Sequence, residues 1–212
     1  MRGAPLIPIQ DVIPTRSAPV ATMILIALNA LMFGAERWID GSGQAAEFWP
    51  AVRPLFFHPV ALAFGINLLY LWLFGDNVED QLGRTRFALL YVASGLSAAG
   101  AQALGAPDSE RFGLGASGAI GGVLGAYFLL YPRSRVLTLV PFPLSLHELP
   151  AGFFLFFWYL FQILTLAAIE AGSGAVQLGP AFVAHAAAFL TGAALCFALR
   201  RRERARVEWW GS

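Results

Sequence analysis

The sequence predicts an all-α membrane protein, a bundle of six membrane-spanning helices with both termini in the cytoplasm. Of its 212 residues, 58% are hydrophobic and only 13% are charged, whereas about a quarter of the residues in a typical soluble domain are charged. The mean hydropathy of +0.64 agrees with this composition. Six apolar runs each approach the ~20 residues that a helix needs to cross a bilayer.

The organisation predicted from these runs is a single membrane domain, residues 18–199, between a cytoplasmic tail (1–17) and an arginine-rich cytoplasmic tail (200–212). No polar stretch is long enough to bury a core of its own. The net charge of +1 argues against nucleic-acid binding. The single cysteine, Cys196, excludes an intrachain disulfide. Three scattered histidines and one cysteine give no zinc-ligand spacing, so we expect neither a metal nor a cofactor.

The first apolar run, about 18–34, follows a proline-containing segment that we expect to be an irregular surface tail. A signal peptide is the alternative, but the run is long, follows a long tail and lacks a small-x-small cleavage site. We therefore predict a retained span. Residues 35–57 mix aromatic and charged side chains, which is typical of the membrane interface.

Five further apolar runs follow, at about 56–74, 87–104, 113–131, 151–169 and 178–199. The second holds Asn67 near mid-depth and His58 near its entrance, and the sixth contains His185. The fifth is rich in aromatic residues, which we expect to face lipid and neighbouring helices. We expect a charge network at the inner surface, formed by Asp76, Glu79, Asp80, Arg84 and Arg86.

The arginines set the orientation, because basic residues near span ends favour the cytoplasmic side. With both termini inside, the outer segments hold three: Arg37, Arg53 and Arg111. The inner segments hold eleven: Arg2, Arg16, Arg84, Arg86, Arg133, Arg135, Arg200, Arg201, Arg202, Arg204 and Arg206. This bias predicts cytoplasmic termini.

The fourth run opens with a glycine-rich stretch that carries one hydroxyl, Ser117. Gly118 and Gly122 are four residues apart, as are Gly121 and Gly125, so a helix here has smooth strips that another helix can approach closely. The simplest interpretation is a packing helix whose serine bonds to a preceding carbonyl.

His185 makes a second interpretation stronger, because an ionisable side chain inside a span is costly unless it has a partner or a function. Ser117 and His185 both lie in runs predicted to cross from outside to inside, and His185 is ~10 Å below the outer surface at 1.5 Å per residue. Ala184, Ala188 and Gly192 give its helix a small face that matches the glycine strips. A structural histidine is the alternative for His185 alone. Together, the two residues predict nucleophilic acyl transfer, in which an imidazole removes the serine proton.

Several motifs, in this order, resemble those of the rhomboid family of intramembrane serine proteases. Residues 115–118 (GASG) resemble its GxSG motif, and Ala184-His185 resembles its histidine helix. Residues 74–83 are similar to the stretch after its second span, and residues 148–151 with Gln162 to its fifth span. The resemblance runs from about Trp49 to Leu199.

The resemblance implies a Ser–His dyad without an acidic third member, in which Ser117 is the nucleophile and His185 the general base and acid. Asn67 and the Ser117 backbone N–H would donate to the oxyanion. The substrate would be a transmembrane segment of another protein within the lipid bilayer, and the location a bacterial inner membrane.

The sequence departs from the family pattern at a few positions. His58 matches the first histidine of the second span, but Ala63 stands where the family usually has the second, an oxyanion donor. Gly121 stands where some relatives place an aromatic residue against the histidine ring. The alternative is therefore a weakly active or non-proteolytic rhomboid-like protein that binds transmembrane segments. A transporter or channel would show discontinuous spans and polar groups in both membrane halves, and the sequence shows neither.

Overall fold

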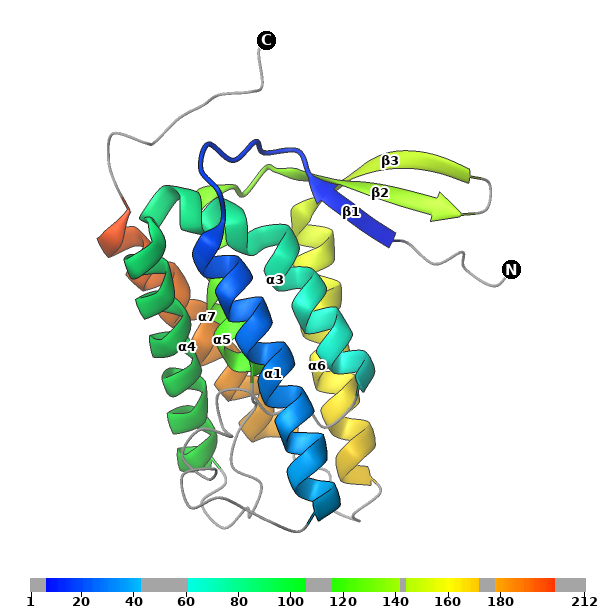
Figure 1. Cartoon of the computed structure of the whole chain (residues 1–212), viewed down its shortest axis with the longest axis vertical. Coiled ribbons are helices and arrows are strands. Elements are labelled where there is room, and N and C mark those ends of the chain that lie inside the picture. Colours follow the sequence, from blue (N-terminus) through cyan, green and yellow to red (C-terminus); the bar gives the residue numbers. More distant parts are fainter. Residues whose placement is uncertain (1–6, 43–60, 106–115, 142–143, 172–177, 201–212) are drawn as a thin grey trace.

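The computed structural model describes residues 7–42, 61–105, 116–141, 144–171 and 178–200. These residues form a mostly helical bundle, in which successive helices alternate in direction, so that the first and last described segments lie at the same end (Figure 1). The helices are α1 (Val20–Ser42), α3 (Ala61–Leu82), α4 (Arg84–Gly105), α5 (Ala116–Leu130), α6 (Ala151–Ala171) and α7 (Leu178–Leu199). The mostly helical bundle confirms the helical part of the predicted class, whereas the three strands show that the protein is not all-α. The cytoplasmic position of both termini stays a prediction.

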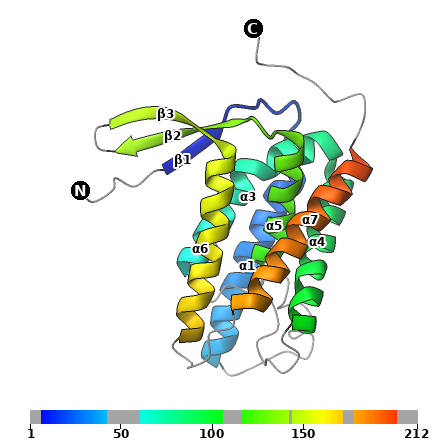
Figure 2. The ribbon, with the colours of Figure 1, turned by 180° about the vertical axis from the view of Figure 1, so that it is seen from behind.

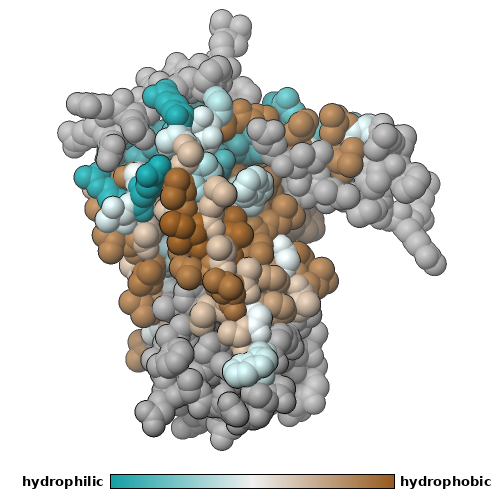
Figure 3. Space-filling model, viewed as in Figure 1, coloured by the Kyte–Doolittle hydropathy of each residue, from teal (hydrophilic) through white to brown (hydrophobic). Residues whose placement is uncertain are grey.

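The helix surface is apolar along much of the bundle. In Figure 3, hydrophobic side chains cover the described part of the helices, and hydrophilic ones gather at the end that carries the chain termini. The exposed hydrophobic residues come from several helices, among them Leu31 (67% exposed), Leu89 (60%) and Leu190 (66%). A monomer in water rarely exposes so much contiguous apolar surface, whereas lipid accommodates it.

Two described helices are long and apolar enough to cross a membrane, α4 and the Phe182–Leu199 part of α7. Shorter apolar helical segments are Val20–Ala35, Ala116–Leu130 and Ala151–Leu160. The count of six spans therefore stays a prediction from the sequence.

A three-stranded antiparallel sheet lies at one end of the bundle and projects sideways beyond the helices (Figure 1). Its order is β1 (Ile7–Asp11), β2 (Arg135–Pro141) and β3 (Leu144–Pro150). The expectation of an irregular tail was therefore wrong for residues 7–11. Apolar residues with β-branched ones among them favour a strand in β2, and pairing with β2 supplies the order that β1 lacks locally.

Asp11 anchors β1 to the helices beneath it. Its Oδ2 accepts hydrogen bonds from the Tyr127 hydroxyl and from Asn77 Nδ2, both at 2.7 Å. The side chain is 6% exposed. The sheet is thus joined to α3 and α5 by buried polar contacts as well as by apolar packing.

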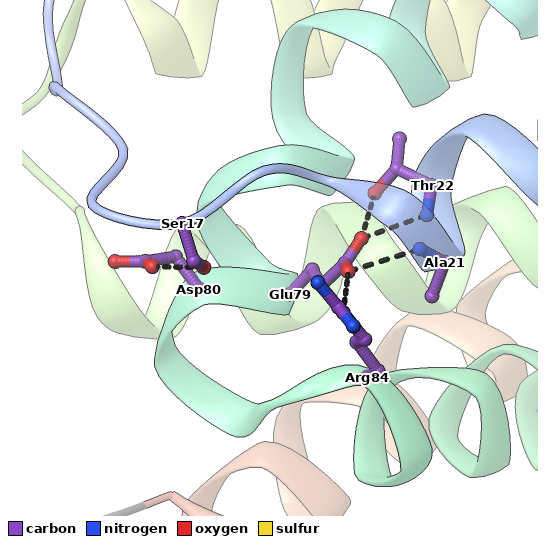
Figure 4. Close-up of polar contacts among 6 residues, drawn as sticks. All are labelled: Ser17, Ala21, Thr22, Glu79, Asp80 and Arg84. Carbon is purple, nitrogen blue, oxygen red and sulfur yellow. Dashed lines mark hydrogen bonds and ion pairs between the residues drawn. The ribbon is translucent and has the colours of Figure 1, made fainter.

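Glu79 connects α3 to the start of α1 (Figure 4). Its carboxylate accepts hydrogen bonds from the Ala21 N–H (2.9 Å), the Thr22 N–H (2.7 Å) and the Thr22 hydroxyl (2.8 Å). The first N–H groups of a helix have no partner within it, and a carboxylate also interacts favourably with the positive end of the helix dipole. Glu79, itself 2% exposed, therefore caps α1 from another helix.

Three other members of the expected charge network, Asp80, Arg84 and Arg86, also make polar contacts at this end of the bundle. Arg84 lies 3.9 Å from Glu79, and the Ser17 hydroxyl donates to Asp80 at 2.6 Å. Arg86 donates to the Leu199 carbonyl at 2.8 Å, which ties the start of α4 to the end of α7. The helix that carries Glu79 ends at Leu82, and the following Gly83 has φ +83°, a conformation that favours glycine.

The centre of the bundle is formed by α5, whose residues Ala116–Tyr127 are all buried. It packs chiefly against α7 and α4, and Figure 2 shows α7 crossing over α5 with α4 alongside. The helices α4 and α7 also contact each other, and the Ser97 and Thr191 hydroxyls form a hydrogen bond of 2.8 Å between them.

Candidate active site

Ser117 is the second residue of α5 and is 5% exposed. Because α5 begins part-way along the bundle (Figure 2), its first turn lies inside the protein. The first N–H groups of a helix have no intrahelical acceptor and carry the positive end of its dipole. The serine thus stands where backbone donors can stabilise a developing negative charge.

His185 lies in α7 and is fully buried. Its position relative to α5 follows from Gly121, one turn after Ser117. A Cβ placed on Gly121 would lie 3.9 Å from the His185 carbonyl oxygen and 3.8 Å from Ala188 Cβ. The segment of α7 that holds His185 therefore packs on the first turns of α5. Direct contact between the Ser117 hydroxyl and the imidazole stays a prediction.

The close approach of these helices depends on residues without large side chains. A Cβ on Gly192 would overlap the Gly122 carbonyl group, and a Cβ on Gly125 would overlap the Phe189 carbonyl group. Ala184 and Ala188 are fully buried. The small face predicted for the His185 helix, and its match to the glycine strips of α5, are confirmed.

Asn67 lies in α3 and is 1% exposed. The Trp158 indole Nε1–H of α6 donates a hydrogen bond to Asn67 Oδ1 at 3.2 Å. An indole nitrogen can only donate, so the oxygen branch of the Asn67 amide faces the indole. The NH₂ branch, which would serve as an oxyanion donor, is turned away from it.

Two aromatic rings of α6 lie edge-on to the imidazole. Trp158 lies edge-on to His185 with ring centroids 5.8 Å apart, and Tyr159 does so at 6.0 Å. We expected the aromatic residues of this run to face lipid and neighbouring helices, and exposed ones such as Phe156 agree with that. The expectation did not identify the buried Trp158 as a neighbour of the site. A buried indole N–H needs a partner, but the sequence of this aromatic run gives no sign of which of its aromatic residues are buried.

Some residues from the sequence analysis lie outside the described part of the chain: Trp49, His58 and Gly113–Gly115, as well as the side chains of Ala63 and Gln162. His147 is described; it lies exposed on β3, at the sheet end of the bundle, where Nε2 and the Ser145 hydroxyl are 3.0 Å apart. No group of three or more metal-ligating side chains that could hold a metal is found among the described residues.

Comparison with known proteins supplies the family. The model of the rhomboid domain matches residues 45–202. The rhomboid protease GluP of Bacillus subtilis (strain 168) is 33% identical over 129 residues, 53% of this chain and 24% of that protein. The mitochondrial rhomboid protein 1 of Saccharomyces cerevisiae is 37% identical over 90 residues, 40% of this chain and 26% of that protein.

The putative rhomboid protease YdcA of B. subtilis is 31% identical over 129 residues, 54% of this chain and 64% of that protein. The matched part of this chain thus spans about a quarter of the length of the first two relatives and under two thirds of the third. The domain model, however, covers most of the sequence. The chain therefore belongs to the rhomboid family, whose members are integral membrane proteins and generally intramembrane serine proteases.

Proposed function

We propose that this protein is an intramembrane serine endopeptidase that cleaves transmembrane segments of other membrane proteins. The observation that supports this most strongly is the packing of the Ser117 turn of α5 against the His185 segment of α7. Both residues are buried within the bundle, where a polar side chain is costly without a role.

In this mechanism, His185 accepts the Ser117 hydroxyl proton as Oγ attacks the carbonyl carbon of the scissile peptide bond. The Asn67 NH₂ group and the Ser117 backbone N–H donate hydrogen bonds to the oxyanion of the tetrahedral intermediate. The intermediate collapses, and His185 returns the proton to the leaving amine. Water, deprotonated by the same imidazole, then hydrolyses the acyl-enzyme and restores Ser117.

The arginine bias supports a cytoplasmic location for the sheet end of the bundle. The first turn of α5 then faces away from the cytoplasm, within the membrane domain. A transmembrane segment would reach it from the lipid, and water from the side opposite the sheet. We propose a bacterial inner membrane as the location, in keeping with two of the relatives, which come from B. subtilis.

A weakly active or non-proteolytic protein that binds transmembrane segments is the second candidate. Its basis is Ala63, which replaces the histidine that rhomboid proteases usually have in this span. One oxyanion donor contributes about 3–4 kcal/mol to transition-state stabilisation. Its absence would slow the chemical step without preventing the binding of a substrate helix.

Labelling with a fluorophosphonate tests both candidates, because the probe reacts only with an activated serine. We expect the detergent-solubilised protein to be labelled, Ser117→Ala and His185→Ala to abolish labelling, and Ala63→His to increase it. Ser145→Ala and His147→Ala are matched controls at the exposed sheet and should label like the unmodified protein.

Labelling of Ser117→Ala would contradict the proposed nucleophile. If the unmodified protein were folded but unlabelled and Ala63→His restored labelling, the non-proteolytic candidate would be favoured. Failure of every folded variant to react would reject serine protease chemistry at this site.

A further inference from the structure

Trp158 contacts three different parts of the proposed site. Its indole N–H binds Asn67 of α3, its ring lies edge-on to His185 of α7, and its Cη2 would lie 3.5 Å from a Cβ on Gly121 of α5. The side chain is 2% exposed. No role for it follows from the Ser–His mechanism itself.

The bond to Asn67 fixes which way the amide points. An asparagine side chain can rotate to exchange its oxygen and nitrogen, and only the nitrogen carries hydrogens that can stabilise an oxyanion. The indole is a donor only, so rotation by half a turn would set two donors against each other. Trp158 therefore holds the amide with its oxygen toward the indole and its NH₂ group away from the indole.

The ring contact acts on the imidazole. At a centroid distance of 5.8 Å and an interplanar angle of 78°, the two rings have the edge-to-face geometry that aromatic pairs prefer. The indole packs against Gly121, where an added Cβ would lie in ordinary van der Waals contact with Cη2, at 3.5 Å. An aromatic residue from α6 thus packs on the histidine at a position where the nucleophile helix supplies none.

We propose that Trp158 is a positioning residue that sets the orientation of the Asn67 amide through its indole N–H and the orientation of the His185 ring through its edge. This inference rests on the proposed function for its catalytic consequence. The alternative is an ordinary core tryptophan, whose replacement would change stability and nothing else.

Replacing the indole N–H without changing the ring separates these two roles. Benzothienylalanine at position 158 keeps the bicyclic shape but carries sulfur in place of the N–H group, and Trp158→Phe removes both the donor and part of the ring. For cleavage of a transmembrane substrate, we expect kcat to fall about tenfold with the sulfur analogue and further with Trp158→Phe, while KM stays within about twofold. An oxyanion donor that is held less well loses part of the hundredfold or more that a fixed one supplies.

The effect should depend on Asn67. In an Asn67→Ala background, the sulfur analogue at position 158 should cause no further loss of kcat, because the group that the N–H orients is already absent. Trp72→Phe is the matched control, since Trp72 lies on α3 and is 54% exposed; its kcat should not change. Equal losses from the sulfur analogue with and without Asn67 would overturn the positioning role.

A spectroscopic measurement tests the bond without relying on activity. In protein labelled with ¹⁵N-tryptophan, the Trp158 indole resonance is identified by its absence in Trp158→Phe, and it should shift and exchange faster with solvent in Asn67→Ala. An unchanged resonance would overturn the inference even if the enzyme is active. The expected shift in a folded protein that neither cleaves nor labels would uphold the orientation of Asn67 and reject the proposed function.

Discussion

Gly192 of α7 packs directly against the backbone of Gly122 of α5, and a single added methyl group on Gly192 would overlap the Gly122 carbonyl. The contact lies two turns along α7 from His185. Without it, the two helices could not approach closely enough to bring the first turn of α5 near that residue. The separation of the helices is thus set by the absence of side chains at this crossing.

Gly192→Ala should therefore destabilise the protein, although alanine is the better helix former by about 1 kcal/mol. Backbone atoms cannot move aside as the end of a flexible side chain can, and overpacking of this kind costs about 1–3 kcal/mol. Gly121→Ala in α5 is the matched control, since its Cβ would make ordinary contacts of 3.5–3.9 Å. Thermal unfolding in detergent should show a lower midpoint for Gly192→Ala alone; the same midpoint for both variants would contradict the crossing geometry.

Glu79→Ala should be among the more destabilising single substitutions at the sheet end. It leaves the buried Thr22 N–H and the Ala21 N–H without their acceptor, and each unsatisfied buried donor costs about 1–3 kcal/mol. The measurement is the free energy of unfolding in mixed micelles.

Glu148→Ala provides the comparison for Glu79→Ala. Glu148 is also paired with an arginine, Arg135 at 3.6 Å, but its side chain is 50% exposed, and exposed ion pairs contribute about 0–1 kcal/mol. We expect this variant to unfold almost like the unmodified protein. A loss as large as that of Glu79→Ala would mean that charge, and not helix capping, accounts for the effect.

Two carboxyl groups under the sheet should make stability depend on pH. Burial raises the pKa of Asp11 from 3.8 to about 6, although hydrogen bonds from Tyr127, Asn77 and the Ile13 N–H oppose the shift. Burial and then repulsion from Asp11 raise the pKa of Asp76 from 3.8 to about 7. The folded state thus holds these protons more tightly than the unfolded chain, so their contribution is fully present below about pH 4 and is lost as the pH rises to about 7.

Asp76→Asn should remove much of this dependence, because an amide cannot ionise. We expect the unfolding temperature of the unmodified protein to fall between pH 5 and pH 8, and that of Asp76→Asn to fall less, so that the variant is the more stable of the two at pH 8. Glu148→Gln should keep the original pH profile. A variant that follows the unmodified protein across this range would show that Asp76 does not cause the dependence.

The helices could be predicted from the sequence, because their apolar runs are long and their boundaries carry glycine, proline or arginine. The predicted range 178–199 coincides with α7, and 151–169 differs from α6 by two residues. The predicted ranges 18–34 and 56–74, however, each end eight residues before α1 and α3 do. The small faces of α5 and α7 were equally visible, since spacings of three and four residues define a helix face. Both patterns involve residues that are close together in the sequence, so they can be recognised without knowing the fold.

The sheet and Trp158 could not be predicted, because both depend on partners far along the chain. Strand β1 is short, begins beside proline-containing sequence and is ordered through β2, more than a hundred residues away. Likewise, the indole N–H of Trp158 donates a hydrogen bond to Asn67, which is 91 residues earlier in the sequence. A tryptophan in an aromatic, apolar run has the composition of a lipid-facing residue, and only the fold shows that its N–H points inward.

The pairing of β1 with β2 also sets a time order on the synthesis of the protein. Asp11 pairs with Val136, roughly 125 residues later, and a ribosome that adds ~5–20 residues per second needs roughly 6–25 s to supply that partner. Glu79 is synthesised much sooner after α1, so it can cap that helix before the partner strand of β1 has been made. The sheet end of the bundle therefore closes only after α5, with Ser117, has been made, and until then the Asp11 carboxylate remains open to water and ionised.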